Sequence, residues 1–589
     1  MVQSCIVWLT GLSKPKSVIQ LQGQPQLKPH FLACAAVVLL AFTGLNYHLA
    51  NPDEGRYAEI PREMIERGDW ITPTLNYTPY FEKPPLAYWL TAVSLKLFGE
   101  HEWAIRLIPA LAALLGMLIA YRLSRRTVGP AAARWAPLLL FTSPLYFAMA
   151  RIPLTDTVFA VCLAAAMAAW WEWERSEGQS RWLGPATGVL VGLAILTKGP
   201  VAVVLFVGSV GLYLLATRRL TWRRVGGGAF AVLVGCAVAA PWFLAAQHYN
   251  PGFANYFFIV QNFDRFSGEN FSEHVKPVWY FLPMAVLGMG MWAAMWPWAI
   301  ARIPAAWRNS QPDQRQAWLY LASWAVFPVF FFSLSSCKLV TYILPIQWSL
   351  AALSAYGIDK LLSKPEVTPG VRRVMVAVAI FALAVLAWGV PELASRDPHL
   401  SSSPVTTISF GIVIATWLAA AVALVAAPRL RLPQWRWATL VVAGTLVWAG
   451  LVPSYGDLVK GMHLSGILPT TLHADGPGRA CTLAEYREYD QSLSFYTHMR
   501  VVLIDKVDEI KLGLKEPDAA EWFRTGEASI DELSARGPLA LVVKAKAAEE
   551  VAAAHHLALY RKNADRALLL NQAAVEALAV SPEKVSHAQ

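Results

Sequence analysis

Long apolar segments recur along the chain up to about residue 453, and short polar connections separate them. A transmembrane helix needs about twenty consecutive, mostly apolar residues. By that criterion the sequence contains about thirteen membrane-spanning segments. They lie near residues 30–48, 101–121, 133–150, 156–173, 182–197, 199–217, 226–246, 279–301, 317–335, 339–357, 372–390, 405–427 and 437–453. The pattern therefore predicts a polytopic α-helical membrane domain over residues 1–453.

The connections between these segments differ in charge. Alternate connections are rich in arginine and lysine, for example residues 122–134, 218–224 and 429–436. Because basic loops tend to stay in the cytoplasm, we expect the other connections to face the periplasm or the cell exterior. The lysines that precede the first segment place the N-terminus in the cytoplasm, and we interpret this segment as an uncleaved anchor.

Residues 83–99 form one further apolar stretch, which is short for a span. Counting it as a span would reverse the side of every later connection and contradict the charge pattern. We therefore expect this stretch to form a helix that lies along the membrane interface on the outer side.

The pattern changes beyond Pro453, where charged helical segments alternate with short apolar runs. The runs at 501–504, 539–543 and 567–570 have the length and composition of strands. This alternation predicts a small soluble α/β domain over residues 454–589. Because an odd number of spans precedes it, we expect this domain in the periplasm.

Composition agrees with a membrane protein. Hydrophobic residues make up 56% of the chain and charged residues 15%, whereas typical soluble domains are about 25% charged. The net charge of +10 falls mostly in the short loops, where it fixes orientation and attracts the headgroups of membrane lipids. It does not indicate nucleic-acid binding. The six cysteines form no CxxC pair, so we predict neither a disulfide framework nor a zinc site from them.

The first outer connection carries most of the candidate chemistry. Residues 51–85 are rich in charged and aromatic side chains and begin an expected catalytic loop over residues 51–100. Asp53 and Glu54 come directly after the first span, and Arg56 and Tyr57 follow them. Charged groups held beside a membrane usually serve function. We therefore interpret this acidic pair as functional.

A second acidic residue, Asp156, ends the next outer connection. Two interpretations remain open for it, because Thr155 and Asp156 could also cap the helix that follows. Outer connections also carry a set of cations, and Tyr342 follows the last of them. The set is Lys83 beside Glu82, Lys198, Arg265 and Lys338. One such side chain often only reaches for lipid headgroups, but four together suit the phosphate of an anionic lipid.

The sequence shows no Gly-rich phosphate loop, HExxH motif or GxSxG elbow. An activated substrate must therefore arrive as a donor that already resides in the membrane. The segments DEGRYAEIPREM, FEKPPLAYWL, RIPLTDT, LTKGP and KLVTYILP resemble the aminoarabinose transferase and protein O-mannosyltransferase families. These are glycosyltransferases of the GT-C class that use a sugar linked to a polyprenyl phosphate. The tail, with CTLAEYREYDQSLSFYTHMRVVLID, resembles the periplasmic domain of the aminoarabinose transferases.

This resemblance implies roles for the candidate residues. Asp53 matches the catalytic aspartate of the first loop, and Asp156 matches the second acidic position. Lys83, Arg265 and Tyr342 match contacts to the donor phosphate. The remaining substrate-binding candidates are Glu54, Arg56, Tyr57, Glu82, Lys198 and Lys338.

One departure from the family pattern concerns the residues before the Phe-x-Arg-Phe stretch. The family often has a Glu-His pair there, and this chain has Gln261 and Asn262. The acceptor or the sugar could therefore differ from those of the best-known members. No cofactor is certain from the sequence, but Glu82 and His274 are candidate ligands for a divalent metal. A lone loop histidine is more often only a hydrogen-bonding residue.

The resemblance implies an inverting glycosyltransferase of the bacterial inner membrane, with its active site facing the periplasm. We expect it to move 4-amino-4-deoxy-L-arabinose from undecaprenyl phosphate to lipid A. One alternative is a related transferase that acts on a protein hydroxyl or another envelope glycan. A lipid or solute transporter ranks lower, because transporters often show internal repeats and broken helices at mid-membrane, and here the charges gather on the outer side.

Overall fold

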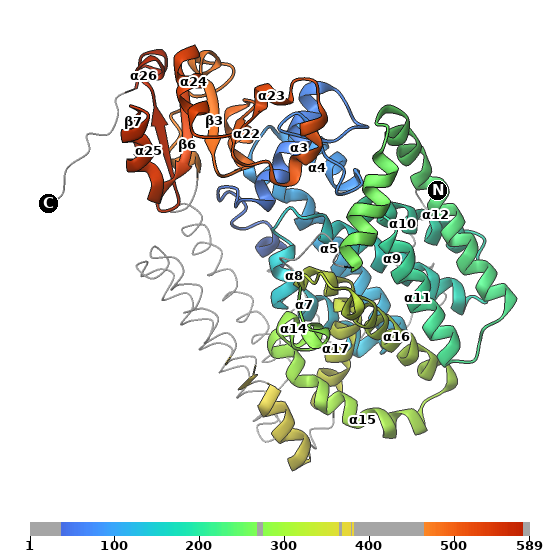
Figure 1. Cartoon of the computed structure of the whole chain (residues 1–589). Coiled ribbons are helices and arrows are strands. Elements are labelled where there is room, and N and C mark those ends of the chain that lie inside the picture. The colour runs from blue at the N-terminus through green and yellow to red at the C-terminus, as the bar shows by residue number, and fades with distance from the viewer. Residues whose placement is uncertain are drawn as a thin grey trace.

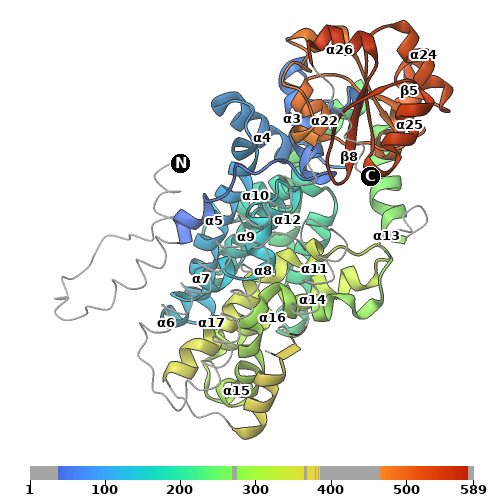
Figure 2. The same cartoon turned by 90° about the vertical axis from the view of Figure 1, so that its left-hand side faces the viewer.

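The computed structural model describes residues 37–267, 275–363, 368–378, 380, 381, 384 and 464–580. A bundle of helices forms the larger part, and an α/β domain lies at one end of it, next to α3 and α4 (Figure 1). Figure 2 shows this domain above the bundle, with α15 at the opposite end.

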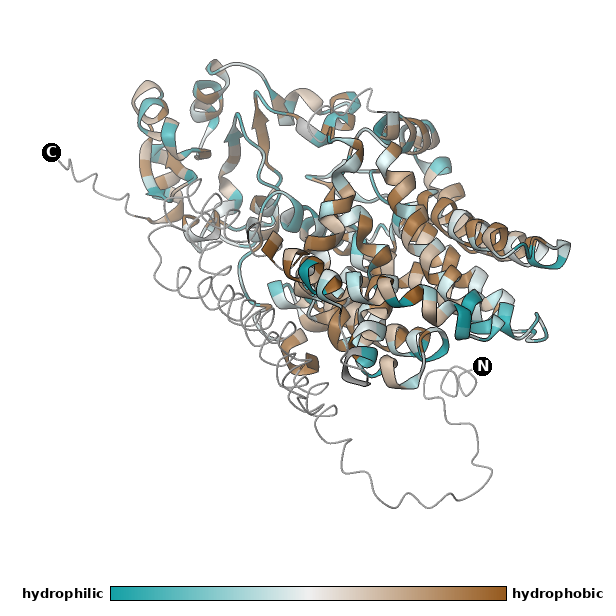
Figure 3. Cartoon of the chain, turned by 90° about the horizontal axis from the view of Figure 1, so that it is seen from below, coloured by the Kyte–Doolittle hydropathy of each residue, from teal (hydrophilic) through white to brown (hydrophobic). Residues whose placement is uncertain are grey.

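Most apolar segments in the described ranges form helices close to the expected bounds. The bundle contains α5 (Glu102–Thr127), α9 (Thr155–Arg175), α10 (Leu183–Lys198), α11 (Val201–Ala216), α12 (Trp222–Tyr249), α16 (Pro312–Leu334) and α17 (Gln347–Ser363). Four helical stretches of the described residues are long and apolar enough to cross a membrane: Glu102–Thr127, Trp222–Tyr249, Val278–Asn309 and Pro312–Leu334. Seen from below, the bundle is mostly apolar, with hydrophilic residues at the helix ends (Figure 3).

The expected span at 133–150 is wrong as a single helix. It consists of α6 (Pro130–Ala133), α7 (Ala136–Phe141) and α8 (Pro144–Met149). Proline lacks an amide hydrogen and ends the preceding helix, and the proline at the start of α8 follows Ser143, whose backbone is extended. These short helices nevertheless remain buried in the bundle.

Two other expected spans also differ from simple helices. The span at 279–301 is a succession of η2 (Val278–Tyr280), α14 (Phe281–Met289), η3 (Gly290–Met295) and α15 (Trp296–Asn309). Gly290 has φ +57° at the junction, which glycine adopts without strain. The span at 339–357 begins with η4 (Val340–Ile346) before α17. The spans at 405–427 and 437–453 and the boundary at 453 lie outside the described residues. Of the span at 30–48 the structure describes residues 37–48, which are helical only at 37–41, and of the span at 372–390 it describes residues 372–378, 380, 381 and 384, which are helical.

The first outer connection contains a helix that the sequence pattern did not indicate. Helix α3 (Asp53–Arg67) has acidic residues in its first turn and ends at Gly68 with φ +65°. On it, Arg62 bonds Glu59 and Glu66, both at 2.7 Å, pairs that are one turn apart. A short hairpin follows, made of β1 (Thr74–Leu75) and β2 (Thr78–Pro79). The stretch at 83–99 forms α4 (Leu86–Phe98), so the helix expected there is confirmed, and its place at the membrane interface stays a prediction.

The connection after α12, described over residues 250–267 and 275–277, also contains helical structure. It contains the π-helix η1 (Asn255–Asp264) and the single turn α13 (Arg265–Ser267). An isolated bridge pairs Val275 with Cys337. This connection therefore presents Arg265 from a helical segment that is tied to the η4 connection.

The described part of the tail contains a six-stranded mixed sheet. Its strand order is β5-β4-β3-β6-β8-β7, and β3 pairs in parallel with β4 and β6. The strands are β3 (Thr482–Tyr486), β4 (Val502–Ile504), β5 (Phe523–Arg524), β6 (Leu539–Lys544), β7 (Ala558–Lys562) and β8 (Arg566–Leu570). The three strands expected from apolar runs are confirmed as β4, β6 and β8. Helices α22 (Ser492–Thr497), α24 (Ala528–Arg536), α25 (Ala548–Ala554) and α26 (Gln572–Leu578) accompany the sheet.

The α/β domain shares a core with the first outer connection. Tyr57, Ile60 and Met64 of α3 lie in one buried apolar cluster with residues of β3, β4 and β8. In the hairpin, the Asn76 side chain donates to the Val501 carbonyl at 2.9 Å and accepts from the Val501 amide at 2.8 Å. These two hydrogen bonds resemble those that join neighbouring strands of a sheet. The outer connection is therefore held between the helical bundle and the α/β domain.

Candidate active site

The first candidate, Asp53, opens α3 at the end of the bundle that lies next to the α/β domain. Its side chain is 54% exposed, and its Oδ1 lies 3.3 Å from Nη1 of Arg56, one turn later. A carboxylate in a first turn is stabilised by the helix dipole. Asp53 is therefore reachable and only loosely held, which suits a group that must meet a substrate.

The adjacent residue, Glu54, is buried. Its Oε2 lies 2.7 Å from Nη2 of Arg106, and the same oxygen accepts from the amide of Ala50 at 2.8 Å. The Tyr47 hydroxyl donates to Oε1 at 3.2 Å. Both oxygens of this carboxylate therefore accept bonds from protein groups. The bond to Arg106 joins the start of α3 to α5. The structure does not bring Glu54 into the open part of the site.

A group of opposite charges surrounds Glu82, just before α4. The Glu82 Oε2 atom lies 3.8 Å from Nζ of Lys83 and 4.0 Å from Nη1 of Arg265. Burial, followed by the charge of Arg265, lowers the pKa of Lys83 to about 8. Burial would raise the pKa of Glu82, but Lys83, Arg56 and Arg265 together lower it. The two cations are thus kept together by one carboxylate.

Asp156 lies in the same neighbourhood, but it does not cap its helix. The N-cap of α9 is Leu154, and no side chain bonds to the cap. Instead the Lys198 ammonium donates to Asp156 Oδ1 at 2.6 Å. The same ammonium lies 5.1 Å from the ring centre of Tyr342. Both Asp156 and Lys198 influence the pKa of Lys83, so these residues belong to the same charge cluster.

Arg56 connects this cluster with the α/β domain. Its Nε donates to Glu509 Oε1 at 2.9 Å, and Glu509 lies in η7 (Asp508–Lys515). Burial raises the pKa of Glu509 to about 7, against the opposing effect of Arg56. Tyr57, the next residue of α3, is buried and stacks on Tyr88 with ring centres 5.8 Å apart.

Sequence reasoning missed both Glu509 and Arg106. A lone arginine inside an apolar segment was a usable signal for Arg106, because an unpaired charge is costly there. Glu509 gave no such signal, since it is one acid among many in a charged tail. The α/β domain therefore contributes a side chain to the charge network of the site.

Two other candidates are placed differently from the cluster. Lys338 is buried, and its ammonium donates to the carbonyl oxygens of Lys276, at 3.0 Å, and Ser335. It therefore joins two outer connections through their backbones. His274 lies outside the described residues, so a metal site with Glu82 stays a prediction.

Gln261 and Asn262, which stand in place of the family's Glu-His pair, form bonds within η1. Gln261 Nε2 donates to the Tyr256 hydroxyl at 2.9 Å, and Asn262 Nδ2 donates to the Phe257 carbonyl at 2.7 Å. These bonds support the helical segment that presents Arg265. The two amides have thus taken a structural role in this connection.

Comparison with known proteins adds to this geometry. Residues 82–244 match the family model described as dolichyl-phosphate-mannose-protein mannosyltransferase. The chain is 31% identical over 519 residues to the undecaprenyl phosphate-alpha-4-amino-4-deoxy-L-arabinose arabinosyl transferase of Edwardsiella ictaluri, covering 84% of this chain and 89% of the relative. It is also 31% identical over 494 residues to the enzyme of the same name from Pseudomonas aeruginosa strain UCBPP-PA14, covering 81% and 85%.

A solved structure resembles nearly the whole chain. The crystal structure of ArnT from Cupriavidus metallidurans bound to undecaprenyl phosphate superposes with a TM-score of 0.75 at 27% identity, covering 92% of this chain and 98% of ArnT. The apo state of the same protein superposes with a TM-score of 0.72 at 26% identity.

Fold, site and relatives define this protein as a multi-pass helical membrane glycosyltransferase. More narrowly, the chain belongs to the family of undecaprenyl phosphate-alpha-4-amino-4-deoxy-L-arabinose arabinosyl transferases. The resemblance stated from the sequence motifs is thereby confirmed.

Proposed function

We propose that the protein moves 4-amino-4-deoxy-L-arabinose from undecaprenyl phosphate to lipid A at the periplasmic face of the bacterial inner membrane. The names of the relatives supply the sugar and the carrier, and ArnT was crystallised with undecaprenyl phosphate. The observation that carries the proposal is the half-buried group of Lys83 and Arg265 around Glu82. A phosphate that reaches this group finds two cations that share one carboxylate.

The reaction needs little beyond these charges. An acceptor oxygen forms a bond to the anomeric carbon on the face opposite the phosphate. The bond from that carbon to the phosphate oxygen breaks, and its electron pair leaves with undecaprenyl phosphate, so the configuration inverts. Negative charge grows on the leaving phosphate, and cations fixed in place stabilise such a transition state without reorganising. Lys83 and Arg265 are the residues that we assign to this task.

Asp53 is assigned to the acceptor. If the accepting group is a phosphate of lipid A, it is already anionic near neutral pH, and Asp53 need only orient it or balance the positive charge of the reacting sugar. If the acceptor is a hydroxyl, Asp53 must remove its proton as a general base. Its 54% exposed side chain and its ion pair with Arg56 are compatible with either role.

We further propose about thirteen spans and a periplasmic α/β domain. Support comes from the basic residues in alternate connections and from the contacts of the α/β domain with the first outer connection. A single cysteine at Glu549, an exposed residue of α25, should react with an impermeant thiol reagent once the outer membrane is permeabilised. A second cysteine in residues 218–224 should stay protected. The opposite labelling pattern would overturn this topology.

Mass spectrometry of lipid A and envelope glycans tests the function directly. Cells that lack the protein should carry lipid A without the aminosugar, and expression of the wild-type chain should restore it. The Asp53→Asn chain, produced at the same level, serves as the matched control and should not restore it. If lipid A is identical in all three cultures while an envelope protein or glycan changes, the acceptor proposed here is wrong.

A further inference from the structure

Two histidines and two carboxylates meet where the α/β domain touches the connection between α4 and α5. His473 and Asp475 lie before β3, and His498 follows α22 directly. Candidate ligand atoms of these three residues all lie within 4.8 Å of one another. Glu100, from the α4–α5 connection, places Oε2 at 2.6 Å from Nε2 of His498. We call these four residues the junction cluster.

The backbone holds the two histidines of the junction cluster in place. The amide of Ala474 donates to the Thr497 carbonyl at 2.9 Å, which ties the two segments together. His498 adopts φ +56° and closes α22 through its own amide, which donates to the Ser494 carbonyl at 2.7 Å. As a result the two imidazole rings lie with centres only 4.2 Å apart. The protein's own backbone bonds therefore hold the two histidine side chains close together.

The donor set of the junction cluster suits a transition metal. Imidazole nitrogen and carboxylate oxygen are the usual ligands of Zn²⁺, which takes four of them in a tetrahedron. Ligand atoms about 2.1 Å from such an ion lie about 3.4 Å from one another. The ligand atoms of the three residues therefore need to approach one another by at most about 1.4 Å to reach that geometry. Partial exposure of His473, at 29%, and high exposure of Asp475, at 86%, leave an entry path from water.

We propose that the junction cluster binds one Zn²⁺ ion, with His473, Asp475 and His498 as ligands and Glu100 holding His498 in position. Carboxylates that hold a ligating imidazole in this way tune many metal sites. This site is distinct from the candidate pair of Glu82 and His274. It also stands independently of the identity of the sugar and the acceptor.

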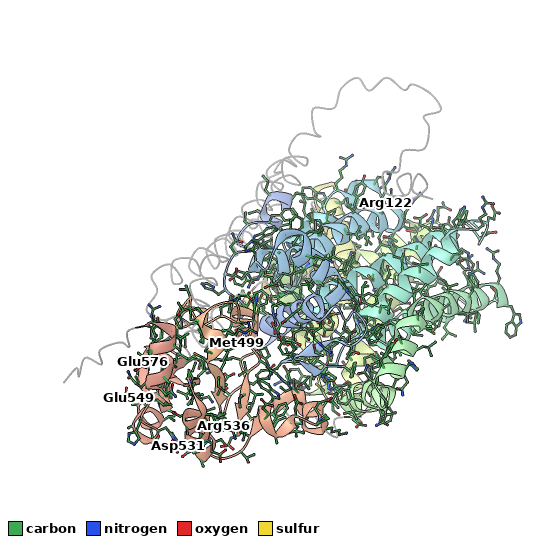
Figure 4. The ribbon with its side chains drawn as sticks, turned by 90° about the horizontal axis from the view of Figure 1, so that it is seen from above. Arg122, Met499, Asp531, Arg536, Glu549 and Glu576 are labelled. Carbon is green, nitrogen blue, oxygen red and sulfur yellow. The ribbon has the colours of Figure 1, made fainter. Side chains whose placement is uncertain are left out.

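The position of the junction cluster indicates a structural role for the ion. Met499, the neighbour of His498, lies where the α/β domain meets the rest of the molecule (Figure 4). Helix α22 contacts α3, and its Ser492 hydroxyl accepts from Asn51, two residues before Asp53, at 2.8 Å. Glu100 comes two residues after α4, which begins just beyond Lys83. An ion held here would therefore join the α/β domain to both segments that carry the main site residues.

Metal content of the full-length protein tests the proposal. The protein is purified in detergent with an affinity tag that contains no histidine, stripped with EDTA, desalted and exposed to Zn²⁺ alone. Wild-type protein should retain one equivalent of zinc more than the His473→Asn/His498→Asn double variant, as measured by inductively coupled plasma mass spectrometry. His556→Asn is the matched control, because His556 is exposed and also has positive φ, +53°, a conformation that asparagine tolerates. It should retain the same zinc as wild type.

Three further measurements make the result specific. Zn²⁺ should raise the Tm of the stripped wild-type protein by about 5 °C and leave the double variant unchanged. Glu100→Gln should weaken zinc binding by about 10- to 100-fold. Glu82→Gln should keep the equivalent that the double variant loses. If the double variant folds poorly, Asp475→Asn replaces it, since this residue is exposed. Equal zinc content in wild type and junction variants, or loss of this equivalent in Glu82→Gln, would overturn the proposal.

Discussion

The two neighbouring acids at the start of α3 end in opposite environments. Asp53 is 54% exposed and has one cation at 3.3 Å, whereas Glu54 is 2% exposed and bonds Arg106 at 2.7 Å. Both are charged groups beside a membrane, and the sequence alone marks them equally. The difference shows that the bonding of a carboxylate, rather than its position in a motif, decides whether it is available for chemistry.

Asp53→Asn should give the largest loss of activity. The substitution keeps the shape of the side chain and removes its charge, so transfer should fall by about 100- to 10,000-fold if Asp53 acts as a base. The Tm and the binding of the donor lipid should stay close to wild type, because the side chain has few partners. Turnover of purified protein checks this. Near-normal turnover would instead direct attention to Asp156 as the catalytic carboxylate.

Glu54→Gln should show the reverse behaviour. Removing one partner of a buried ion pair leaves an uncompensated charge and costs about 3–5 kcal/mol, here on Arg106. We expect a lower Tm and a poorer yield, with activity per folded molecule reduced less than in Asp53→Asn. Thermal unfolding of both variants, side by side, makes the measurement. A stable but inactive Glu54→Gln protein would contradict the structural role assigned to Glu54.

Lys83→Ala should reduce turnover by about a hundredfold, because it removes one fixed donor from the leaving phosphate. Lys96 on the same helix, α4, is exposed and provides the control. Its substitution by alanine should change turnover by less than about twofold, as is usual for isolated surface charges. Equal losses for the two variants would show that Lys83 only reaches for lipid headgroups.

A pH profile should give a smaller and more specific effect at the same residue. Burial and Arg265 lower the pKa of Lys83 to about 8, so kcat/KM should fall severalfold as the pH rises from 8 to 9 and the ammonium loses its proton. Between about pH 8 and 10.5 the folded state binds fewer protons than the unfolded state, so stability should rise while activity falls. Lys83→Arg stays charged and should lose this alkaline decline. An unchanged profile in Lys83→Arg would assign the decline to another group.

Much of the helical bundle could be predicted because long apolar runs identify spans without knowledge of their partners. The division of the segment at 133–150 into short helices could also be predicted, since Pro130, Pro137 and Pro144 recur at seven-residue spacing and each can end a helix. Helix α3 was missed because it is charged on most sides and contains Pro61. Its acidic first turn and terminal Gly68 were the available signals.

The candidate site was harder to predict than the fold. Motifs placed Glu82, Lys83 and Arg265 in a common set, and the structure brings these three together. Lys338 carries the same charge in a similar connection, yet backbone carbonyls hold it. No pattern in the sequence separates these two outcomes, because the partners come from segments far apart in the chain. Glu509 lies 453 residues after Arg56, so its place in the site could not be predicted for the same reason.

That separation has a consequence for how the enzyme is made. Chains grow at about 5–20 residues per second, so Arg56 leaves the ribosome roughly 20–90 seconds before Glu509 does. During that interval the spans can insert, but α3 lacks the strands that share its core and Asn51 lacks Ser492. A nascent or prematurely ended chain thus holds the early half of the site without its support. We therefore expect transfer of the sugar only after translation has delivered the α/β domain.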